Sequence, residues 1–329
     1  MTFARQDDAT GRRLAYGGGM SETHPGSPGI EADGLKRAFG DVRAVDGVSF
    51  VAPAGAVTAL IGPNGSGKTT LLLLLSGLLK PDAGRAAVDG YDLSAQNLQA
   101  RSRIGWMPDV FGTWDALTCT EILSTFARAY GIAKPEAERR ALDLLERVYL
   151  AEFAPRPARV LSRGQKQRLG LARALVHDPS VLLLDEPASG LDPRSRIELR
   201  EVLRGLAGEG KTVLVSSHVL SELEEVYDHA VFLSQGRTVE LATAAQPASM
   251  SRGWRLDAID PVALRTFLDD ADIPWQPGAA GEVVVQLAGY ESAAELLHAA
   301  VAAGVLVHTV APLSGRLEEA YLSLDQERV

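Results

Sequence analysis

The sequence is short of cysteine and of long apolar runs. Its 329 residues include one cysteine, Cys119, so no disulfide can form within the chain, and the composition fits a reducing compartment. The longest apolar run, residues 71–79, is interrupted by Ser76 and Gly77, whereas a membrane span needs ~20 apolar residues. The chain does not open with a basic and then apolar signal peptide. We therefore expect a cytoplasmic protein that would act at a membrane only from its inner face and through a partner.

Positive charge is also scarce. The chain has 33 Lys and Arg against 42 Asp and Glu, a formal net charge of -9. Proteins that bind nucleic acids carry a basic excess or a basic stripe, so we expect no nucleic-acid partner. The same charge disfavours adsorption to anionic lipid. With 46% hydrophobic and 23% charged residues, the composition is that of a globular protein long enough for two domains.

The hydrophobic pattern divides the chain into four parts. Residues 1–28 are polar and glycine-rich and predict a disordered arm. Over residues 29–241, strands alternate with helices, which predicts an α/β domain whose mostly parallel sheet is covered on both faces. An all-helical insert is expected at about 109–178. Residues 242–252 are interpreted as a linker, and residues 253–329 have a βαββαβ order that suggests a small ferredoxin-like α+β domain.

The strongest chemical signal follows the apolar segment 57–61. It consists of Gly62, four further residues, and then Gly67-Lys68-Thr69, with an apolar helix after it, which is the pattern of a phosphate-binding loop. Glycines allow backbone N–H groups to surround a triphosphate, Lys68 would reach the β- and γ-phosphates, and the Thr69 hydroxyl would ligate Mg²⁺. The nucleotide-binding residues expected here are Gly62, Asn64, Gly65, Ser66, Gly67, Lys68, Thr69 and Thr70.

A second motif, Val181-Leu182-Leu183-Leu184-Asp185-Glu186-Pro187, is an apolar strand that ends in two carboxylates. Ligands of open α/β sheets bind at such strand ends. We expect Asp185 to hold Mg²⁺ and Glu186 to polarise the attacking water as a general base. The alternative is a strand that ends in a solvated acidic turn.

A third motif precedes a helix near residue 164. Ser162 is a natural N-cap and Gln165 completes a capping box. The same helix start, with Ser162 and the Gly164 amide exposed, could also bind a phosphate. Since residues 62–70 already cradle one triphosphate, this spare helix terminus suggests a site that another subunit completes.

These motifs, in this order, resemble those of the ATP-binding subunit of an ABC transporter, a P-loop NTPase cassette, over about residues 30–240. The resemblance implies an ATPase with ATP and Mg²⁺ as cofactors. It also implies that two such subunits, here expected as a homodimer, meet head to tail around two ATP molecules. A transmembrane permease subunit would convert their motion into transport. Residues 317–324 are similar to the ending of ATP subunits of drug, antibiotic and lipid-related exporters.

The resemblance also assigns roles. It gives Lys68, Thr69 and Asp185 to ATP and Mg²⁺ and makes Glu186 the catalytic base. Its remaining assignments are Ser162, Gly164 and Gln165 to the ATP of the opposite subunit, Ser189-Gly190-Leu191-Asp192 to the loop that links the two sites, His218 to the γ-phosphate, and Phe39 to adenine stacking.

One position departs from the family pattern, which has Gln where this chain has Asp109. A carboxylate can still meet the metal, but it is shorter and repels the γ-phosphate, so metal contact by Asp109 is left open. Two other functions also remain as alternatives. One is a soluble ABC-type ATPase that acts on DNA or ribosomes without transport, and the other is a regulatory module with an inactive site.

Overall fold

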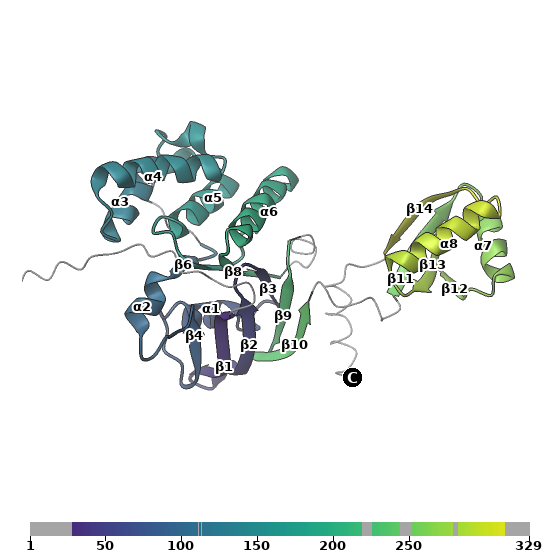
Figure 1. Ribbon diagram of the computed structural model, residues 1–329, viewed down its shortest axis with the longest axis horizontal. Helices are drawn as coiled ribbons and strands as arrows, with labels where there is room; N and C mark the ends of the chain where they lie inside the picture. The colour runs from purple at the N-terminus through teal and green to yellow at the C-terminus, as the bar shows by residue number, and fades with distance from the viewer. Residues whose placement is uncertain are drawn as a thin grey trace, which may run out of the picture.

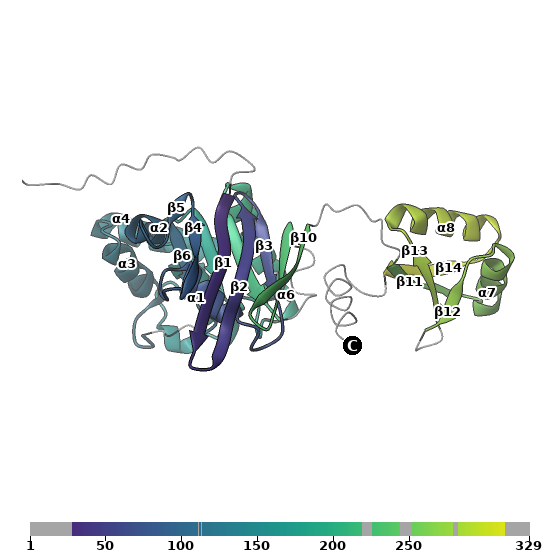
Figure 2. The ribbon, with the colours of Figure 1, turned by 90° about the horizontal axis from the view of Figure 1, so that it is seen from below.

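The computed structural model describes residues 28–110, 112, 114–218, 226–243, 252–278 and 282–312. Its first sheet is antiparallel, in the strand order β2-β1-β4-β5. The strands are β1 (Pro28–Phe39), β2 (Val42–Pro53), β4 (Ala83–Val88) and β5 (Tyr91–Asp92). Figure 2 shows β1 and β2 as the two long strands of this sheet.

The second sheet has six strands in the order β10-β9-β3-β8-β7-β6. All neighbours pair in parallel except β10, which is antiparallel to β9 at the edge. The strands are β3 (Val57–Ile61), β6 (Ile104–Met107), β7 (Val181–Leu184), β8 (Thr212–Ser217), β9 (His229–Ser234) and β10 (Arg237–Thr243). Because β3, β7 and β8 are buried along their whole length, their sequences lack the alternation of apolar and polar residues that marks a strand with one exposed face.

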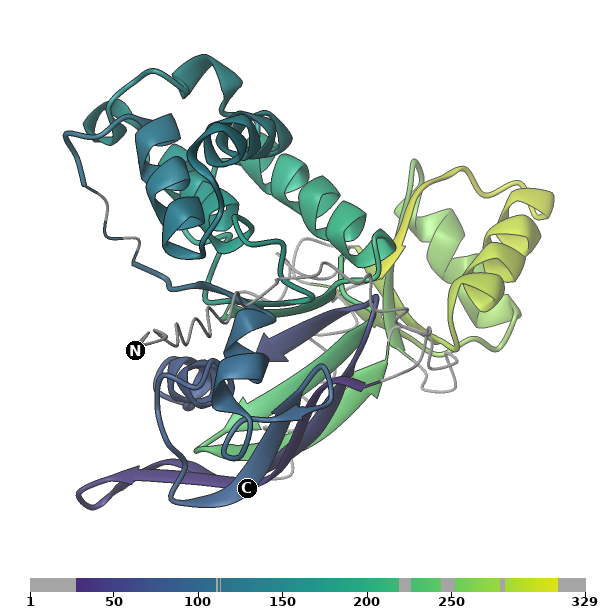
Figure 3. The same cartoon turned by 60° about the vertical axis from the view of Figure 1, so that its left-hand side comes forward.

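Helices cover one face of this sheet. Leu182 and Leu184 of β7 point into an apolar cluster formed with these helices, and Figures 1 and 3 show the helices gathered on this side. They are α3 (Cys119–Ala129), α4 (Lys134–Arg147), α5 (Arg163–Ala174) and α6 (Pro193–Gly208), with the short 3₁₀ turns η1 (Ala151–Phe153) and η2 (Ala158–Val160). The first three helices and both turns lie within the insert that the sequence predicts at about 109–178.

The opposite face packs on the antiparallel sheet and on two helices. Val181 and Leu183, which alternate with the previous pair, belong to this second cluster, as expected from the two-residue period of a strand. The helices are α1 (Lys68–Leu75) and α2 (Asn97–Ser102). The six-stranded sheet is therefore buried on both faces, as the sequence predicts.

The C-terminal part forms a third sheet with its own apolar cluster, in which Trp254 is the largest buried side chain. The elements are β11 (Arg252–Ala258), α7 (Pro261–Asp270), β12 (Trp275–Pro277), β13 (Val283–Leu287), α8 (Tyr290–Ala302) and β14 (Val307–Pro312). This βαββαβ order agrees with the sequence prediction. The sheet is antiparallel, in the order β12-β13-β11-β14, which is the arrangement of a ferredoxin-like fold.

Some predicted boundaries differ from those observed. Strand β10 continues to Thr243 and β11 begins at Arg252, so both ends of the predicted linker 242–252 are strand. Backbone pairing with β9 and β13 explains this extension. The predicted arm, apart from Pro28, the rest of the linker and the segment 317–324 lie outside the described residues. The division of the chain into domains stays a prediction.

A partly buried histidine, His177, connects the helical layer to the strand that precedes Asp109. The His177 ring stacks on Tyr130 at the end of α3, with 3.9 Å between centroids. Its Nε2 lies 3.0 Å from the carbonyl oxygen of Ile104 in β6, while its Nδ1 is buried without a hydrogen-bond partner. Burial lowers the pKa of His177 from 6.5 to about 4, because a second N–H would have no acceptor.

This geometry predicts that the stability contributed by His177 depends on pH. The folded-state pKa lies below the unfolded one, so the contribution of His177 to stability is complete above about pH 6.5 and declines as the pH falls towards 4, by up to ~3 kcal/mol. We expect the unfolding temperature to fall more steeply between pH 7.5 and pH 5 for the wild type than for His177→Gln, measured by calorimetry. Parallel curves for the two proteins would contradict the assignment.

Candidate functional site

The phosphate-loop residues occupy the turn between β3 and α1. Gly65 and Gly67 have φ of 80° and 102°, a backbone region that favours glycine. A Cβ on Gly67 would lie 2.1 Å from the Ala44 carbonyl oxygen. Asn64 is exposed and Thr70 is half-buried, whereas the Ser66 hydroxyl is buried without a hydrogen-bond partner. The loop is thus packed tightly on the side that faces β2.

Lys68 lies at the start of α1, with its side chain 6% exposed. Its Nζ donates to the carbonyl oxygens of Gly62, at 2.7 Å, and Pro63, at 3.3 Å. The same ammonium lies 3.6 Å from Glu186 Oε1. The structure therefore brings the loop lysine and the proposed base together from segments far apart in the sequence.

Asp185 connects the loop to strand β8. Its Oδ2 accepts from the Thr69 hydroxyl at 2.8 Å and its Oδ1 accepts from the Ser216 hydroxyl at 2.7 Å. Burial raises the pKa of Asp185, the two hydroxyl contacts lower it, and the nearby carboxylates of Glu186 and Asp109 raise it. This carboxylate is surrounded by hydrogen-bond donors but also by negative charge, which favours a cation beside it.

Glu186 is held in an unusual backbone conformation, with φ of 50°. Its amide donates to Ser216 Oγ at 2.9 Å, and its Oε2 lies 2.8 Å from Nδ1 of His218. A non-glycine residue with this φ is strained and commonly belongs to a functional site. Glu186 thus lies between the Lys68 ammonium and the His218 imidazole, as a general base that orients water would require.

Sequence reasoning did not single out Ser216. It is fully buried and its hydroxyl contacts both acidic residues of the Asp185-Glu186 pair. The only available signal was its position two residues before His218. A serine at a strand end is too common to be selected without knowing that β8 pairs with β7.

Asp109 follows β6 on the same side of the site. Its backbone carbonyl accepts from Gln167 Nε2 at 3.1 Å, and its Oδ1 is buried without a hydrogen-bond partner. It is close enough to raise the pKa of Asp185. Asp185 itself accepts from the Thr69 hydroxyl, so these three residues offer only oxygen donors, the type that Mg²⁺ prefers.

The described residues contain no cluster of three or more His, Cys, Asp or Glu able to enclose a metal by themselves. Mg²⁺ typically takes one or two carboxylates and completes its shell with water and substrate phosphates. The set of Thr69, Asp185 and Asp109 therefore fits an ion held together with a nucleotide.

Ser162 and Gln165 form the predicted capping box at the start of α5. Ser162 Oγ accepts from the Gln165 amide at 3.2 Å, and Gln165 Oε1 accepts from the Ser162 amide at 2.8 Å. A Cβ on Gly164 would meet Leu191 at 3.0 Å. Among the described residues, no hydrogen bond joins this helix start to residues 62–70, so the two predicted phosphate sites are separate within one chain.

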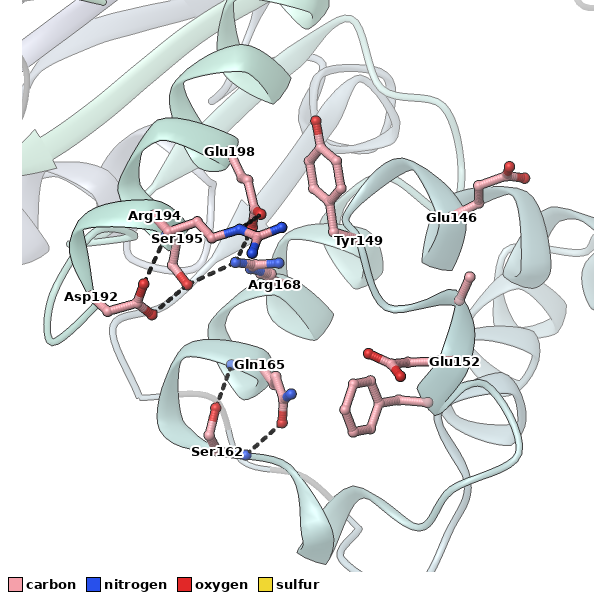
Figure 4. A pocket seen from close by; sticks show the side chains of 12 residues that line it. Glu146, Tyr149, Glu152, Ser162, Gln165, Arg168, Asp192, Arg194, Ser195 and Glu198 are labelled. Atoms are coloured by element: carbon pink, nitrogen blue, oxygen red, sulfur yellow. Dashed lines mark hydrogen bonds and ion pairs between the residues drawn. The ribbon is translucent and has the colours of Figure 1, made fainter.

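A pocket of about 640 Å³ opens beside this helix start. Figure 4 shows Ser162 and Gln165 on one part of its wall and Asp192, Ser195 and Arg168 on another. Asp192 caps α6 by accepting from the Ser195 amide at 3.0 Å, and Arg168 donates to Ser195 Oγ at 2.7 Å. The volume and the mixed polar lining suit part of a small-molecule ligand.

Phe39 is 50% exposed at the end of β1, with the Arg37 guanidinium 5.0 Å from its ring centre. Across the hairpin it pairs with Val42, two residues before Ala44, whose carbonyl approaches the loop at Gly67. Phe39 is therefore a surface aromatic near the phosphate loop. The predicted stacking on adenine is compatible with this position and stays a prediction, as do the other assigned roles.

A glycine-rich loop between a buried strand and a helix, with a carboxylate pair at the end of a neighbouring parallel strand, defines a P-loop nucleotide hydrolase. The chain belongs to the family of ABC transporter ATP-binding proteins, and the family model for ABC transporters matches residues 45–189. It is therefore an ATPase cassette, as the sequence resemblance implies.

Two relatives carry the assignment. Daunorubicin resistance ATP-binding protein DrrA3 of Streptomyces coeruleorubidus is 38% identical over 230 residues, which are 70% of this chain and 73% of that protein. Nod factor export ATP-binding protein I of Ralstonia nicotianae is 37% identical over 274 residues, which are 80% of this chain and 85% of that protein. Both names describe ATP-binding proteins of resistance or export.

Solved structures agree on the fold. The ATP-binding subunit of an ABC transporter superposes with a TM-score of 0.60 at 31% identity, covering 65% of this chain and 90% of that chain. A dimeric post-hydrolysis state of the ATP-binding cassette MJ0796, bound to ADP and Pi, gives 0.61 at 26% identity and covers 66% and 99%. The α/β cassette is thus confirmed.

The tight packing of the loop against β2 leads to a prediction for Gly67→Ala. The added Cβ would meet the Ala44 carbonyl oxygen, so the loop must shift, and we expect ATP affinity to fall at least roughly tenfold. Titration with a fluorescent ATP analogue measures this loss. Gly131→Ala is the matched control, since Gly131 has a φ of 84° but open space around it. Equal affinities of the two variants would contradict the steric argument.

Proposed function

We propose that this chain is the ATP-hydrolysing subunit of an ABC-type exporter. It would dimerise around two ATP-Mg²⁺ and drive transport through a separate membrane subunit. The observation that carries the proposal is the position of the Glu186 carboxylate, between the Lys68 ammonium and the His218 ring. A regulatory module with an inactive site would not need this arrangement.

Each group has a distinct role in the proposed reaction. The backbone N–H groups of the phosphate loop, which exclude Pro63, and the Lys68 ammonium bind and neutralise the β- and γ-phosphates. Glu186 orients the attacking water and accepts its proton, while His218 contacts the γ-phosphate and holds Glu186 in place. Thr69 and Asp185 would hold Mg²⁺, which when bound offsets the phosphate charge, and Asp109 would join them through its unpaired oxygen.

The proposed dimer accounts for the separate helix start at α5. Within one chain, Ser162, Gly164 and Gln165 make no hydrogen bond to the phosphate loop in the described residues. The pocket beside them offers room for part of the nucleotide that a second copy holds. The dimeric form of the related cassette MJ0796 supports two copies, and we infer a homodimer.

A membrane partner is needed for transport. No helix among the described residues is long and apolar enough to cross a membrane, and the relatives are named as ATP-binding proteins of export and of drug resistance. We infer that the chain binds a transmembrane permease at the inner face of the cell membrane. Co-purification of the chain with a membrane protein tests this part separately from hydrolysis.

Glu186→Gln tests the base and the dimer together. The amide cannot accept a proton, so kcat should fall by about 10²- to 10⁴-fold, while the phosphate loop keeps its affinity for ATP. We expect the variant to form a stable ATP-bound dimer, measured by light scattering after gel filtration. A variant that stays monomeric with saturating ATP and Mg²⁺ would rule out the two-copy site.

Asp109→Gln tests the departure from the family pattern. The longer neutral amide can reach the metal and removes a negative charge near the γ-phosphate, so the steady-state ATPase rate should be unchanged or higher. Asp109→Ala is the comparison, because it removes the metal contact without replacing it and should slow hydrolysis. A large loss in Asp109→Gln would show that the carboxylate has a role of its own.

A further inference from the structure

The back of the phosphate loop contacts the turn between β9 and β10. The Gly236 amide donates to the Ser66 carbonyl oxygen at 3.0 Å. On the same side, a Cβ on Gly62 would lie 2.3 Å from the Leu233 carbonyl oxygen. The loop is therefore supported from behind by backbone groups that lie about 170 residues further along the chain.

Strand β2 holds this turn in place. The Asp46 amide donates to the Gly236 carbonyl oxygen at 2.7 Å. Arg237 donates through Nε and Nη2 to Asp46 Oδ2, at 3.1 and 2.7 Å. Lys36 and Arg43 lie 3.8 and 3.7 Å from the same carboxylate, whose side chain is 11% exposed. We call Asp46, Gly236 and Arg237 the turn cluster.

The turn has little room to move. Gly236 has a φ of 76°, and a Cβ there would lie 2.9 Å from the Ala44 carbonyl oxygen and 3.2 Å from that of Arg43. The Ala44 carbonyl is also the group that a Cβ on Gly67 would meet. One stretch of β2 thus touches both the turn and the phosphate loop.

The contact to Ser66 fixes the direction of the next amide. In a planar trans peptide the C=O of one residue and the N–H of the next point in opposite directions. Because the Ser66 carbonyl is directed at Gly236, the N–H of Gly67 is directed away from the turn, towards the inside of the loop. Gly67 N–H is one of the donors expected to bind phosphate.

We propose that Arg237 and Asp46 are positioning residues for ATP binding. Their ion pair fixes the turn between β9 and β10, and the Gly236 N–H of this turn fixes the Ser66 carbonyl by a hydrogen bond. The Gly67 N–H is thereby oriented before the nucleotide binds. Preorganised donors bind more tightly because less ordering is needed on binding. Neither side chain contacts ATP in this scheme. The inference rests on the proposed nucleotide site at residues 62–70.

The test uses the full chain with Arg237→Ala, Arg237→Lys, Asp46→Asn and the double variant Arg237→Ala/Asp46→Asn. Arg147→Ala is the matched control, because it removes an equally short contact, 2.6 Å to Glu209, between the C-terminal ends of α4 and α6. ATP affinity is measured by titration with a fluorescent analogue, kcat and KM by steady-state hydrolysis, and folding by the unfolding temperature.

We expect Arg237→Ala and Asp46→Asn each to weaken ATP binding and raise KM by roughly 3- to 10-fold, with kcat within about twofold of the wild type. The double variant should bind ATP no more weakly than either single variant, because both substitutions break the same ion pair. Arg237→Lys should recover part of the affinity, since a lysine makes a single contact where the arginine makes two. Arg147→Ala should leave affinity unchanged.

Three results would overturn the inference. They are an unchanged KM in Arg237→Ala, additive losses in the double variant, or an equal loss in Arg147→Ala. If Arg237→Ala does not fold, Arg237→Lys and Asp46→Asn carry the same comparison. Failure of the proposed function is distinguishable, because then the wild type itself would not bind ATP and Lys68→Ala would change nothing.

Discussion

The parallel pairing of β3, β8 and β7 is the constraint on which the whole site depends. Its register places Leu60 opposite Ser216 and Leu184 opposite Val215, so the phosphate loop, the acidic pair and the end of β8 emerge at one edge. A slip of one residue would turn every side chain of a strand to the other face and would disrupt the packing of the two apolar clusters that cover the sheet. The burial of the sheet and the alignment of the site therefore have a single cause.

The sequence predicted the features that a short motif defines, and it did not predict those that depend on contacts between residues far apart in the chain. The loop at 62–70 and the pair Asp185-Glu186 were found because each is a short motif with a mechanism of its own. Ser216 and the turn cluster were not found, because their partners are recognisable only in the folded chain. Asp46 and Arg237, for example, are 191 residues apart. The predicted linker began within β10 for the same reason, since the last residues of this strand are ordered by pairing with β9.

The start of α5 shows how one sequence signal can carry two meanings. The capping box is present, so the interpretation of Ser162 and Gln165 as helix-capping residues is correct. A capping box satisfies only some of the free amides of a helix start, and the remaining ones still favour an anion. Among the described residues, no hydrogen bond joins this helix start to the chain's own phosphate loop, so in the proposed function the phosphate bound there would belong to the nucleotide of another copy. The structural role and the proposed binding role are therefore compatible.

Charge determines what this site will accept. Asp185, Glu186 and Asp109 approach one another while Lys68 contributes a single positive charge nearby, and the raised pKa of Asp185 reflects both its burial and these neighbouring carboxylates. An unpaired buried oxygen on Asp109 adds to the cost of leaving the site without a further cation. A triphosphate alone would increase this repulsion, whereas a triphosphate that brings a divalent cation would relieve it. In the proposed function, the carboxylate of Asp109 would therefore favour the binding of nucleotide and metal together, which is the form that the proposed reaction uses.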